Sequence, residues 1–155
     1  MPKMVPLNAW VCDSCLQEVD IEDGWVEWLS PDKGGPHSFR ICHNDDRCQK
    51  HTDHPDRHDG HLENFLGIDG MQYFLSFLDI GLLLDPNEKY MPSAPEMRSF
   101  VEAFRRLQIP HYEEARQYHS VARSEGYFSD QNEVSASLPS TCESIIKRYE
   151  SEENA

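Results

Sequence analysis

Two segments decide how the first third of this chain folds: WVCDSC at residues 10–15 and ICHNDDRCQKH at residues 41–51. The first contains two cysteines separated by two residues, and the second contains two further cysteines and two histidines. A tetrahedral Zn²⁺ site is typically built from two such groups of ligands, each presented by a short loop. The sequence therefore predicts one structural zinc ion bound by side chains from both segments.

Six side chains in these segments are candidate ligands for the four positions around the ion. They are Cys12, Cys15, Cys42, His43, Cys48 and His51. Spacing favours the thiols of the Cys-x-x-Cys pair and the thiol of Cys48. The fourth ligand is an open choice among the other three.

We place His43 first for this fourth position, His51 second and Cys42 third. Side chains alternate between the faces of a strand, so His43 shares a face with the apolar residues Phe39 and Ile41. If that face packs on the core, the His43 imidazole emerges on the side where the first cysteine pair is expected. The predicted metal ligands are therefore Cys12, Cys15, His43 and Cys48.

A β-hairpin is expected between the two segments. Residues 25–29 are strand formers, residues 30–36 are rich in Pro and Gly, and residues 37–43 form a second strand. This layout resembles a zinc ribbon or treble-clef-like module, in which a Cys-x-x-Cys knuckle meets a second ligand pair beyond a hairpin. The resemblance covers residues 10–51 and implies a structural zinc ion. It departs from the commonest pattern because the second pair is not Cys-x-x-Cys and no glycine follows Cys15.

Length and charge limit the class of protein. The chain has 155 residues, of which 38% are hydrophobic, and this suits one ordinary domain or a metal-stapled module joined to a small helical one. The formal net charge of -14 disfavours nonspecific attraction to nucleic acid or anionic lipid. No apolar run approaches the about 18 residues that a membrane span requires, so we expect no membrane partner.

Cysteine usage suggests a reducing compartment. The chain has five cysteines, and residues 1–7 lack the apolar core of a secretory signal. Reduced thiols in a cytoplasmic protein favour metal binding over disulfide formation. We therefore expect a cytoplasmic protein.

A polar tract rich in His and Asp follows at residues 51–61. We expect a solvated linker here, with a weak second metal site as the alternative. Asp53 and His54 also resemble part of the HNH nuclease pattern, which pairs a general base with a structural zinc ion. The final His of that pattern is missing, because Tyr73 and Phe74 occupy the region where it would stand.

Helices are expected from residue 62 onward. Asp69 is a suitable N-cap for a helix from Gly70 that carries an apolar stripe. The stripe consists of Met71, Phe74, Leu75 and Leu78. We expect it to be core, and its alternative role is a partner-binding face.

Three more helices are expected downstream. The first follows a capping box of Ser93 and Glu96 and has apolar residues at three- and four-residue spacing. Residues 112–125 form the next. A second capping box, Ser140 with Glu143, begins a short C-terminal helix that we expect to dock on the protein's own core.

The predicted fold class is α+β, with an N-terminal zinc-stapled β-hairpin module packed on a small C-terminal helical module. The expected parts are a flexible N-terminus at 1–9, the zinc-binding β module at 10–51, a His- and Asp-rich linker at 52–61, the helical module at 62–126, a linker at 127–138, and a C-terminal helix with an acidic tail at 139–155. The pattern indicates no particular oligomeric state.

The sequence favours a non-enzymatic, zinc-stabilised interaction or adaptor module whose partner is a protein. It shows no nucleophile with a paired base, no phosphate-binding glycine loop and no basic stripe. The first alternative is a metal-dependent hydrolase or nuclease that uses residues 51–61. The second is a nucleic-acid-associated regulator that uses the arginines of the middle helices. These are Arg98, Arg105, Arg106, Arg116 and Arg123. Nucleic acid is the less expected partner, because Glu113 and Glu114 begin the last of those helices and would repel phosphate.

Overall fold

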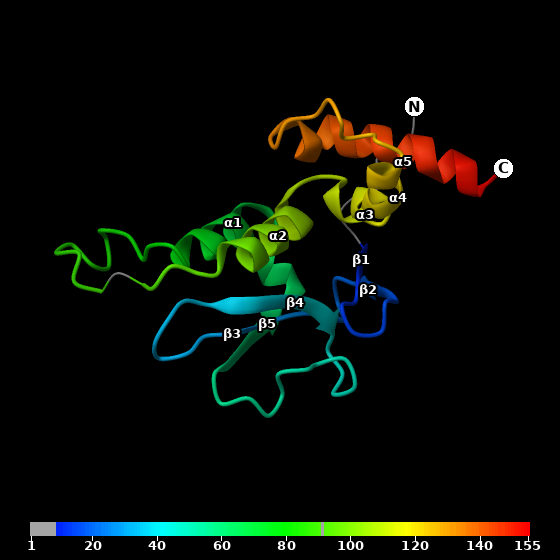
Figure 1. The fold of residues 1–155 in the computed structure, drawn as a ribbon. Coiled ribbons are helices and arrows are strands. Elements are labelled where there is room, and N and C mark those ends of the chain that lie inside the picture. The colour runs from blue at the N-terminus through cyan, green and yellow to red at the C-terminus, as the bar shows by residue number, and fades with distance from the viewer. Residues whose placement is uncertain (1–8, 91) are drawn as a thin grey trace. The chain divides into compact units, whose positions relative to one another are not determined.

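The computed structural model describes residues 9–90 and 92–155, which form two small antiparallel sheets and several helices (Figure 1). The strands lie in the N-terminal half and the helices mostly in the C-terminal half, which confirms the predicted α+β class. Contacts divide the described residues into two compact units, 9–108 and 109–155. The predicted flexible segment 1–9 lies outside the described residues except for its last residue, which begins the first strand.

Two sheets make up the β part of the first unit. The strands are β1 (Ala9–Val11), β2 (Glu18–Asp20), β3 (Gly24–Leu29), β4 (His37–His43) and β5 (Arg57–His61). β1 pairs with β2, and the other three form a sheet in the order β4-β3-β5. The predicted hairpin is confirmed, because β3 and β4 pair from Gly24 with His43 to Leu29 with His37.

β5 lies in the tract that the sequence predicts to be a linker at 52–61, and this expectation is wrong for the second half of the tract. β5 pairs with β3 from Trp25 with His61 to Leu29 with Arg57. It is an edge strand whose side chains are half-buried or exposed. The residues of β5 are not typical strand formers, so its composition does not predict a strand. Backbone pairing with the central strand β3 places it in the sheet.

A cluster of aromatic rings forms the core between the three-stranded sheet and the helices of the first unit. These helices are η1 (Leu62–Phe65), α1 (Gly67–Ser76) and α2 (Met97–Gln108). Ring centroids are 5.8 Å apart for Trp28 and Phe65, 5.8 Å for Phe39 and Phe100, and 5.6 Å for Phe74 and Phe100. Their edge-to-face arrangement is the favourable geometry for aromatic pairs and fixes α1 and α2 against the sheet.

The apolar stripe of α1 does not form core as a whole, so this prediction is wrong for three of its four residues. Phe74 is 1% exposed, whereas Leu75 is 50% exposed, and Met71 and Leu78 are also exposed. Gly70 determines which face turns inward: a Cβ at this position would lie 2.0 Å from the Phe65 carbonyl carbon. Because of this close approach, the Phe74 side chain points toward the core, and those of Met71, Leu75 and Leu78 remain exposed.

The start of α2 also differs from the predicted capping box. The helix begins at Met97, and the Glu96 carboxylate accepts hydrogen bonds from the backbone N–H groups of Arg98 at 3.0 Å and Ser99 at 2.7 Å. Glu96 therefore caps the helix itself instead of supporting Ser93. The backbone N–H of Glu96 donates to the Pro36 carbonyl at 2.8 Å, which holds it in this position.

The second unit is helical. It contains α3 (Tyr112–Arg116), α4 (His119–Ser124), η2 (Ser135–Ser137) and α5 (Pro139–Glu153). The helix expected over 112–125 is interrupted between α3 and α4, where the Tyr118 ring stacks on Tyr149 of α5 at 5.9 Å. α5 packs on α3 through a small core, so the C-terminal helix docks within its own unit as expected.

The start of α5 differs from the predicted capping box of Ser140 and Glu143. α5 starts at Pro139 with no side-chain cap, and the Glu143 carboxylate forms an ion pair with Lys147 at 2.9 Å. In the described part of the chain, every helix is too short or too polar to cross a membrane.

Neighbouring residues of α1 provide a test of its orientation. Phe74→Ala should lower the free energy of unfolding of the first unit by about 3–5 kcal/mol, because it leaves a cavity among the aromatic rings. Leu75→Ala should change it by less than about 1 kcal/mol, because its side chain is exposed. Urea unfolding followed by tryptophan fluorescence measures both, since all three tryptophans lie in this unit. Equal losses from the two substitutions would contradict the orientation.

Candidate metal centre

The first cysteine pair lies in a tight turn between β1 and β2. The turn is closed by hydrogen bonds from Cys12 N–H to the Gln17 carbonyl at 2.8 Å and from Leu16 N–H to the Cys12 carbonyl at 3.0 Å. The N–H groups of Ser14 and Cys15 point at the Cys12 sulfur at 3.4 and 3.5 Å. Such amides stabilise negative charge on a thiolate, so the turn has the local geometry of a metal-binding knuckle.

Leu16 stands where the commonest knuckle has a glycine. Its φ of 62° is in the left-handed region, and its side chain is exposed. A non-glycine residue in this conformation costs on the order of 1–3 kcal/mol, which the surrounding contacts must offset. Leu16 therefore raises the conformational energy of this turn, but its backbone has the left-handed conformation that a glycine would adopt.

The second pair of ligands is brought together by a short loop after β4. His43 ends the strand, and the N–H of Asp45 donates to the His43 carbonyl at 2.8 Å. Cys48 N–H then donates to the Asp45 carbonyl at 2.9 Å, and the Asp45 carboxylate accepts from Arg47 N–H at 2.8 Å. These bonds reverse the chain and return Cys48 to the side of His43.

Four side chains meet where the two loops approach each other. They are Cys12, Cys15, His43 and Cys48, whose ligand atoms all lie within 4.8 Å of one another. The His43 Nδ1 atom is 3.5 Å from the Cys15 sulfur and 3.7 Å from the Cys48 sulfur. Tetrahedral zinc with Zn–S of about 2.3 Å and Zn–N of about 2.0–2.1 Å gives N···S separations of about 3.6 Å. The cluster could therefore hold a metal ion such as zinc.

The second nitrogen of His43 supports the same role. Nε2 lies 3.0 Å from the backbone carbonyl oxygen of Glu18 in β2, and a carbonyl can only accept a hydrogen bond. Nε2 therefore carries a hydrogen, which in the neutral imidazole leaves Nδ1 able to bind a metal ion. Such a backbone partner commonly fixes the tautomer of a metal-bound histidine.

The thiols of the cluster differ in their tendency to ionise. Burial alone would raise the pKa of Cys12, but hydrogen bonds from the backbone N–H groups of Cys15, Ser14 and His43 outweigh it and lower this pKa to about 6. Burial and interactions with the Cys12 and Cys15 thiols raise the pKa of Cys48 to about 11. A divalent cation would favour the thiolate form at every sulfur, so metal binding is expected to release protons.

The competing candidates for the fourth ligand lie elsewhere. Cys42 is fully buried, pairs across the sheet with Trp25, and has a pKa raised to about 12, chiefly by burial. The His51 Nε2 atom lies 3.3 Å from the Ser38 carbonyl oxygen. Among the described residues, the metal-binding group contains His43 and neither of these two.

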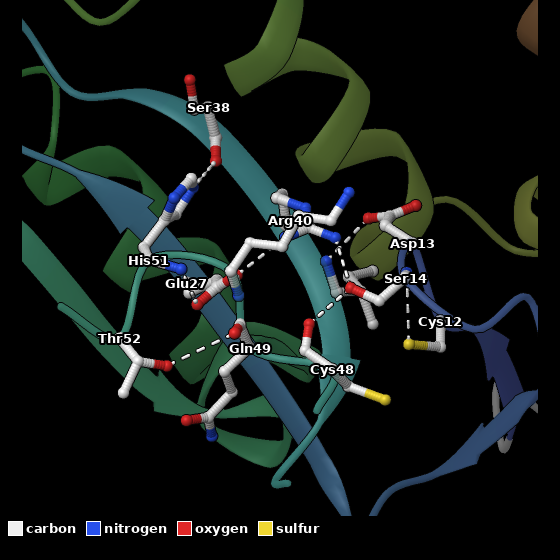
Figure 2. Close-up of polar contacts among 12 residues, drawn as sticks. Cys12, Asp13, Ser14, Glu27, Ser38, Arg40, Cys48, Gln49, His51 and Thr52 are labelled. Carbon is white, nitrogen blue, oxygen red and sulfur yellow. Dashed lines mark hydrogen bonds and ion pairs between the residues drawn. The ribbon is translucent and has the colours of Figure 1, made fainter. Parts of the chain in front are cut away.

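A buried carboxylate that sequence reasoning missed holds the loop after Cys48. Glu27 of β3 is fully buried, and its Oε1 accepts hydrogen bonds from Arg40 Nη1 at 3.0 Å and from Lys50 N–H at 2.9 Å (Figure 2). Its Oε2 accepts from His51 N–H at 3.4 Å. The signal in the sequence is a glutamate within the apolar strand Trp25-Val26-Glu27-Trp28-Leu29, where a charge must find partners to be buried.

The middle residues of the Cys-x-x-Cys turn attach it to the sheet and to α2. The Ser14 hydroxyl accepts from Arg40 Nη2 at 2.6 Å and donates to the Cys48 carbonyl, so it joins the two loops (Figure 2). Asp13 accepts from Ile41 N–H at 2.8 Å and forms an ion pair with Arg106 of α2 at 2.7 Å. The knuckle is therefore held by contacts beyond the thiols.

The histidines of the tract at 51–61 do not form a second metal cluster. His58 stacks on Trp28 at 6.0 Å between ring centroids, His61 packs edge-on against Trp25 at 4.4 Å, and His54 lies 3.9 Å from the Asp56 carboxylate. Across residues 9–90 and 92–155, the Cys and His cluster described above is the only group of three or more potential ligands. The hypothesis of a second metal in this tract therefore gains no support.

One of the arginines considered for nucleic-acid binding is already engaged. Arg106 is buried, its guanidinium donates to Asp13 and to the Val11 carbonyl, and its own carbonyl accepts from the Trp10 indole at 2.9 Å. Its charge is compensated within the protein, so it offers nothing to a phosphate. This weakens the hypothesis of a nucleic-acid-associated regulator.

Comparisons of the chain with models of protein families, with curated proteins and with solved structures found no match. No family is therefore shown for residues 10–51, and what the structure shows there is local geometry. That geometry is the β1–β2 knuckle, the β3–β4 hairpin and the cluster of three cysteines and one histidine.

Single substitutions of two histidines test the fourth ligand. His43→Ala should strongly reduce zinc retention against a competing chelator, because it removes a ligand and leaves the site open. His51→Ala is the matched control and should retain zinc, because its imidazole lies outside the cluster, with Nε2 3.3 Å from the Ser38 carbonyl oxygen. The measurement is chromophoric chelator competition on the purified proteins. Zinc loss from the His51 variant alone would exclude the assignment.

Removal of the buried carboxylate tests the support of the second loop. Glu27→Ala should destabilise the first unit by about 3–5 kcal/mol, because it leaves the Arg40 guanidinium and two backbone N–H groups without their acceptor. Asp32→Ala, at an exposed position between β3 and β4, should change the free energy of unfolding by less than about 0.5 kcal/mol. Urea denaturation measures both, and a Glu27 variant as stable as the control would refute this role.

Proposed function

We propose that this protein is a non-enzymatic module, stabilised by one structural zinc ion, that binds another protein. The observation that carries the proposal is a complete set of four protein ligands, Cys12, Cys15, His43 and Cys48. Catalytic zinc sites use three protein ligands and keep a position for water or substrate, whereas structural sites use four. The ligand set therefore favours a structural ion.

The sheets around the cluster support a structural role for the ion. β1 and β2 have three residues each, and an isolated two-stranded hairpin of this size is marginal in water. Structural zinc in small modules contributes on the order of 10 kcal/mol of apparent binding free energy. An ion bound to Cys12 and Cys15 on one side and to His43 and Cys48 on the other would tie this hairpin to β4.

An interaction role is supported by apolar surface in the same unit. Leu82, Leu83 and Leu84 are all exposed after α1, and Leu83 is 95% exposed. Proteins that act alone rarely expose contiguous apolar residues, and such surface commonly marks a binding site. We also propose a cytoplasmic location, because metal binding by thiolates requires reduced cysteines.

Cobalt substitution tests whether the ion is structural. Co²⁺ bound by three thiolates and one imidazole should give the strong visible bands of tetrahedral coordination. Added azide or imidazole should leave these bands unchanged, because all four positions are filled by the protein. The measurement is a visible absorption titration of the purified protein.

The control is Cys15→Ser, which weakens one ligand and should make the bands sensitive to added azide. Cys42→Ser, outside the cluster, should behave as the unmodified protein. Bands of the unmodified protein that shift on addition of azide would reveal an open position. The proposal of a non-enzymatic module would then fail.

A further inference from the structure

We infer that the exposed apolar surface of α1 and of the segment after it binds a basic, amphipathic segment of another protein. This inference rests on the proposed interaction function and names the surface and the chemistry of the partner. The surface has two parts. The α1 outer face consists of Ile68, Met71 and Leu75 on the helix together with Leu78 in the turn that follows it, and the leucine segment consists of Leu82, Leu83 and Leu84.

The α1 outer face is a single stripe that runs along one side of the helix and into the turn after Ser76. Its members are separated by three, four and three residues, which is the spacing of neighbours along a helical face. Ile68 is 78% exposed and the other three are also exposed, while Phe74 on the inner face is buried in the aromatic core. α1 therefore has two apolar faces, and only the inner one has a partner among the described residues.

The leucine segment is held in a defined turn. Asp79 accepts a hydrogen bond from Gly81 N–H at 2.9 Å, and the Gly81 carbonyl accepts from the N–H of Leu84 at 3.2 Å and of Asp85 at 3.0 Å. The buried Asp85 carboxylate then accepts from the next backbone N–H groups, those of Lys89 at 2.9 Å and Tyr90 at 2.7 Å. In Figure 1 the chain after α1 extends as an irregular loop before it returns to α2.

Charge around this surface selects a cationic partner. Residues 67–85 include three Asp and neither Lys nor Arg. A cavity of 320 Å³ at the leucine segment is lined by Asp79, Leu82, Asp85 and Glu88. A Lys or Arg side chain matches this lining, because its aliphatic stem can pack on Leu82 while its charged end reaches the carboxylates of Asp79 and Glu88. The fitting ligand therefore combines apolar residues with Lys or Arg.

The same charges disfavour the other occupants of an apolar surface. A second copy of the chain in a two-fold interface would bring identical acidic borders together, on molecules that each carry a formal net charge of -14. An anionic membrane would be repelled for the same reason. A basic amphipathic segment satisfies both the apolar stripe and the carboxylates, and helix-in-groove recognition of such segments is a common mode.

The test uses a synthetic peptide of about 18 residues, or five helical turns, with Leu on one face and Lys on the other. A second peptide carries Glu in place of every Lys. Fluorescence anisotropy with the full-length, zinc-loaded protein should show binding of the Leu/Lys peptide and none of the Leu/Glu peptide. The double variant Leu75→Ser/Leu83→Ser should bind the Leu/Lys peptide about tenfold more weakly, which corresponds to about 1.4 kcal/mol.

Two control variants separate specific docking from general attraction to an acidic protein. Val134→Ser/Leu138→Ser removes two exposed apolar residues of the second unit and should leave binding unchanged. Asp79→Asn/Glu88→Gln should weaken binding about threefold, which corresponds to about 0.7 kcal/mol. Asp32→Asn/Glu133→Gln removes two exposed charges elsewhere and should leave binding unchanged. Unchanged zinc content and circular dichroism of each variant show that its fold is intact.

Three results would overturn the inference. The first is equal binding of the Leu/Lys peptide to the unmodified protein and to Leu75→Ser/Leu83→Ser. The second is a dimer in analytical ultracentrifugation that Leu83→Ser dissociates, which assigns the surface to a second copy. The third is flotation of the protein with phosphatidylglycerol vesicles that Leu83→Ser abolishes, which assigns it to a lipid. Each leaves the cobalt result untouched, so failure of this inference is distinguishable from failure of the structural zinc site.

Discussion

The meeting of three sulfurs and one imidazole nitrogen at the junction of the two sheets is the constraint on which the first unit depends. Strands of three residues cannot hold the β1–β2 hairpin in place alone, and its turn includes Leu16 in a left-handed conformation. Three thiols so close together repel one another once ionised. A divalent cation bound by these side chains would neutralise the sulfurs and would join the hairpin to β4.

The rest of the first unit is connected to this junction by buried charges. Asp13, inside the knuckle, is paired with Arg106 of α2, and Glu27 holds the loop that carries Cys48. α2 in turn packs with α1 through Phe74 and Phe100. The metal-binding cluster is therefore joined by contiguous contacts to the helix whose outer face we propose as a binding surface.

Local chemistry explains which parts of this molecule could be predicted from the sequence. The spacing of the cysteines identified three of the side chains that the structure brings together, and strand alternation placed His43 first among the candidates for the fourth. The strand β5 could not be predicted, because pairing with β3 places it and its own composition does not. The periodicity of α1 revealed an apolar face, but the close approach of Gly70 to Phe65 decides which side turns inward. Glu27 was missed because its partners come from three separate segments.

X-ray absorption spectroscopy at the zinc edge, on protein purified without added metal, would identify both the ion and its ligands. We expect one zinc ion per chain, surrounded by three sulfur atoms at about 2.3 Å and one nitrogen atom at about 2.0–2.1 Å. Removal of the ion should expose the backbone amides of residues 9–20 to hydrogen exchange. A metal-free protein with the same protection of these amides, or an ion bound mainly by oxygen atoms, would contradict this expectation.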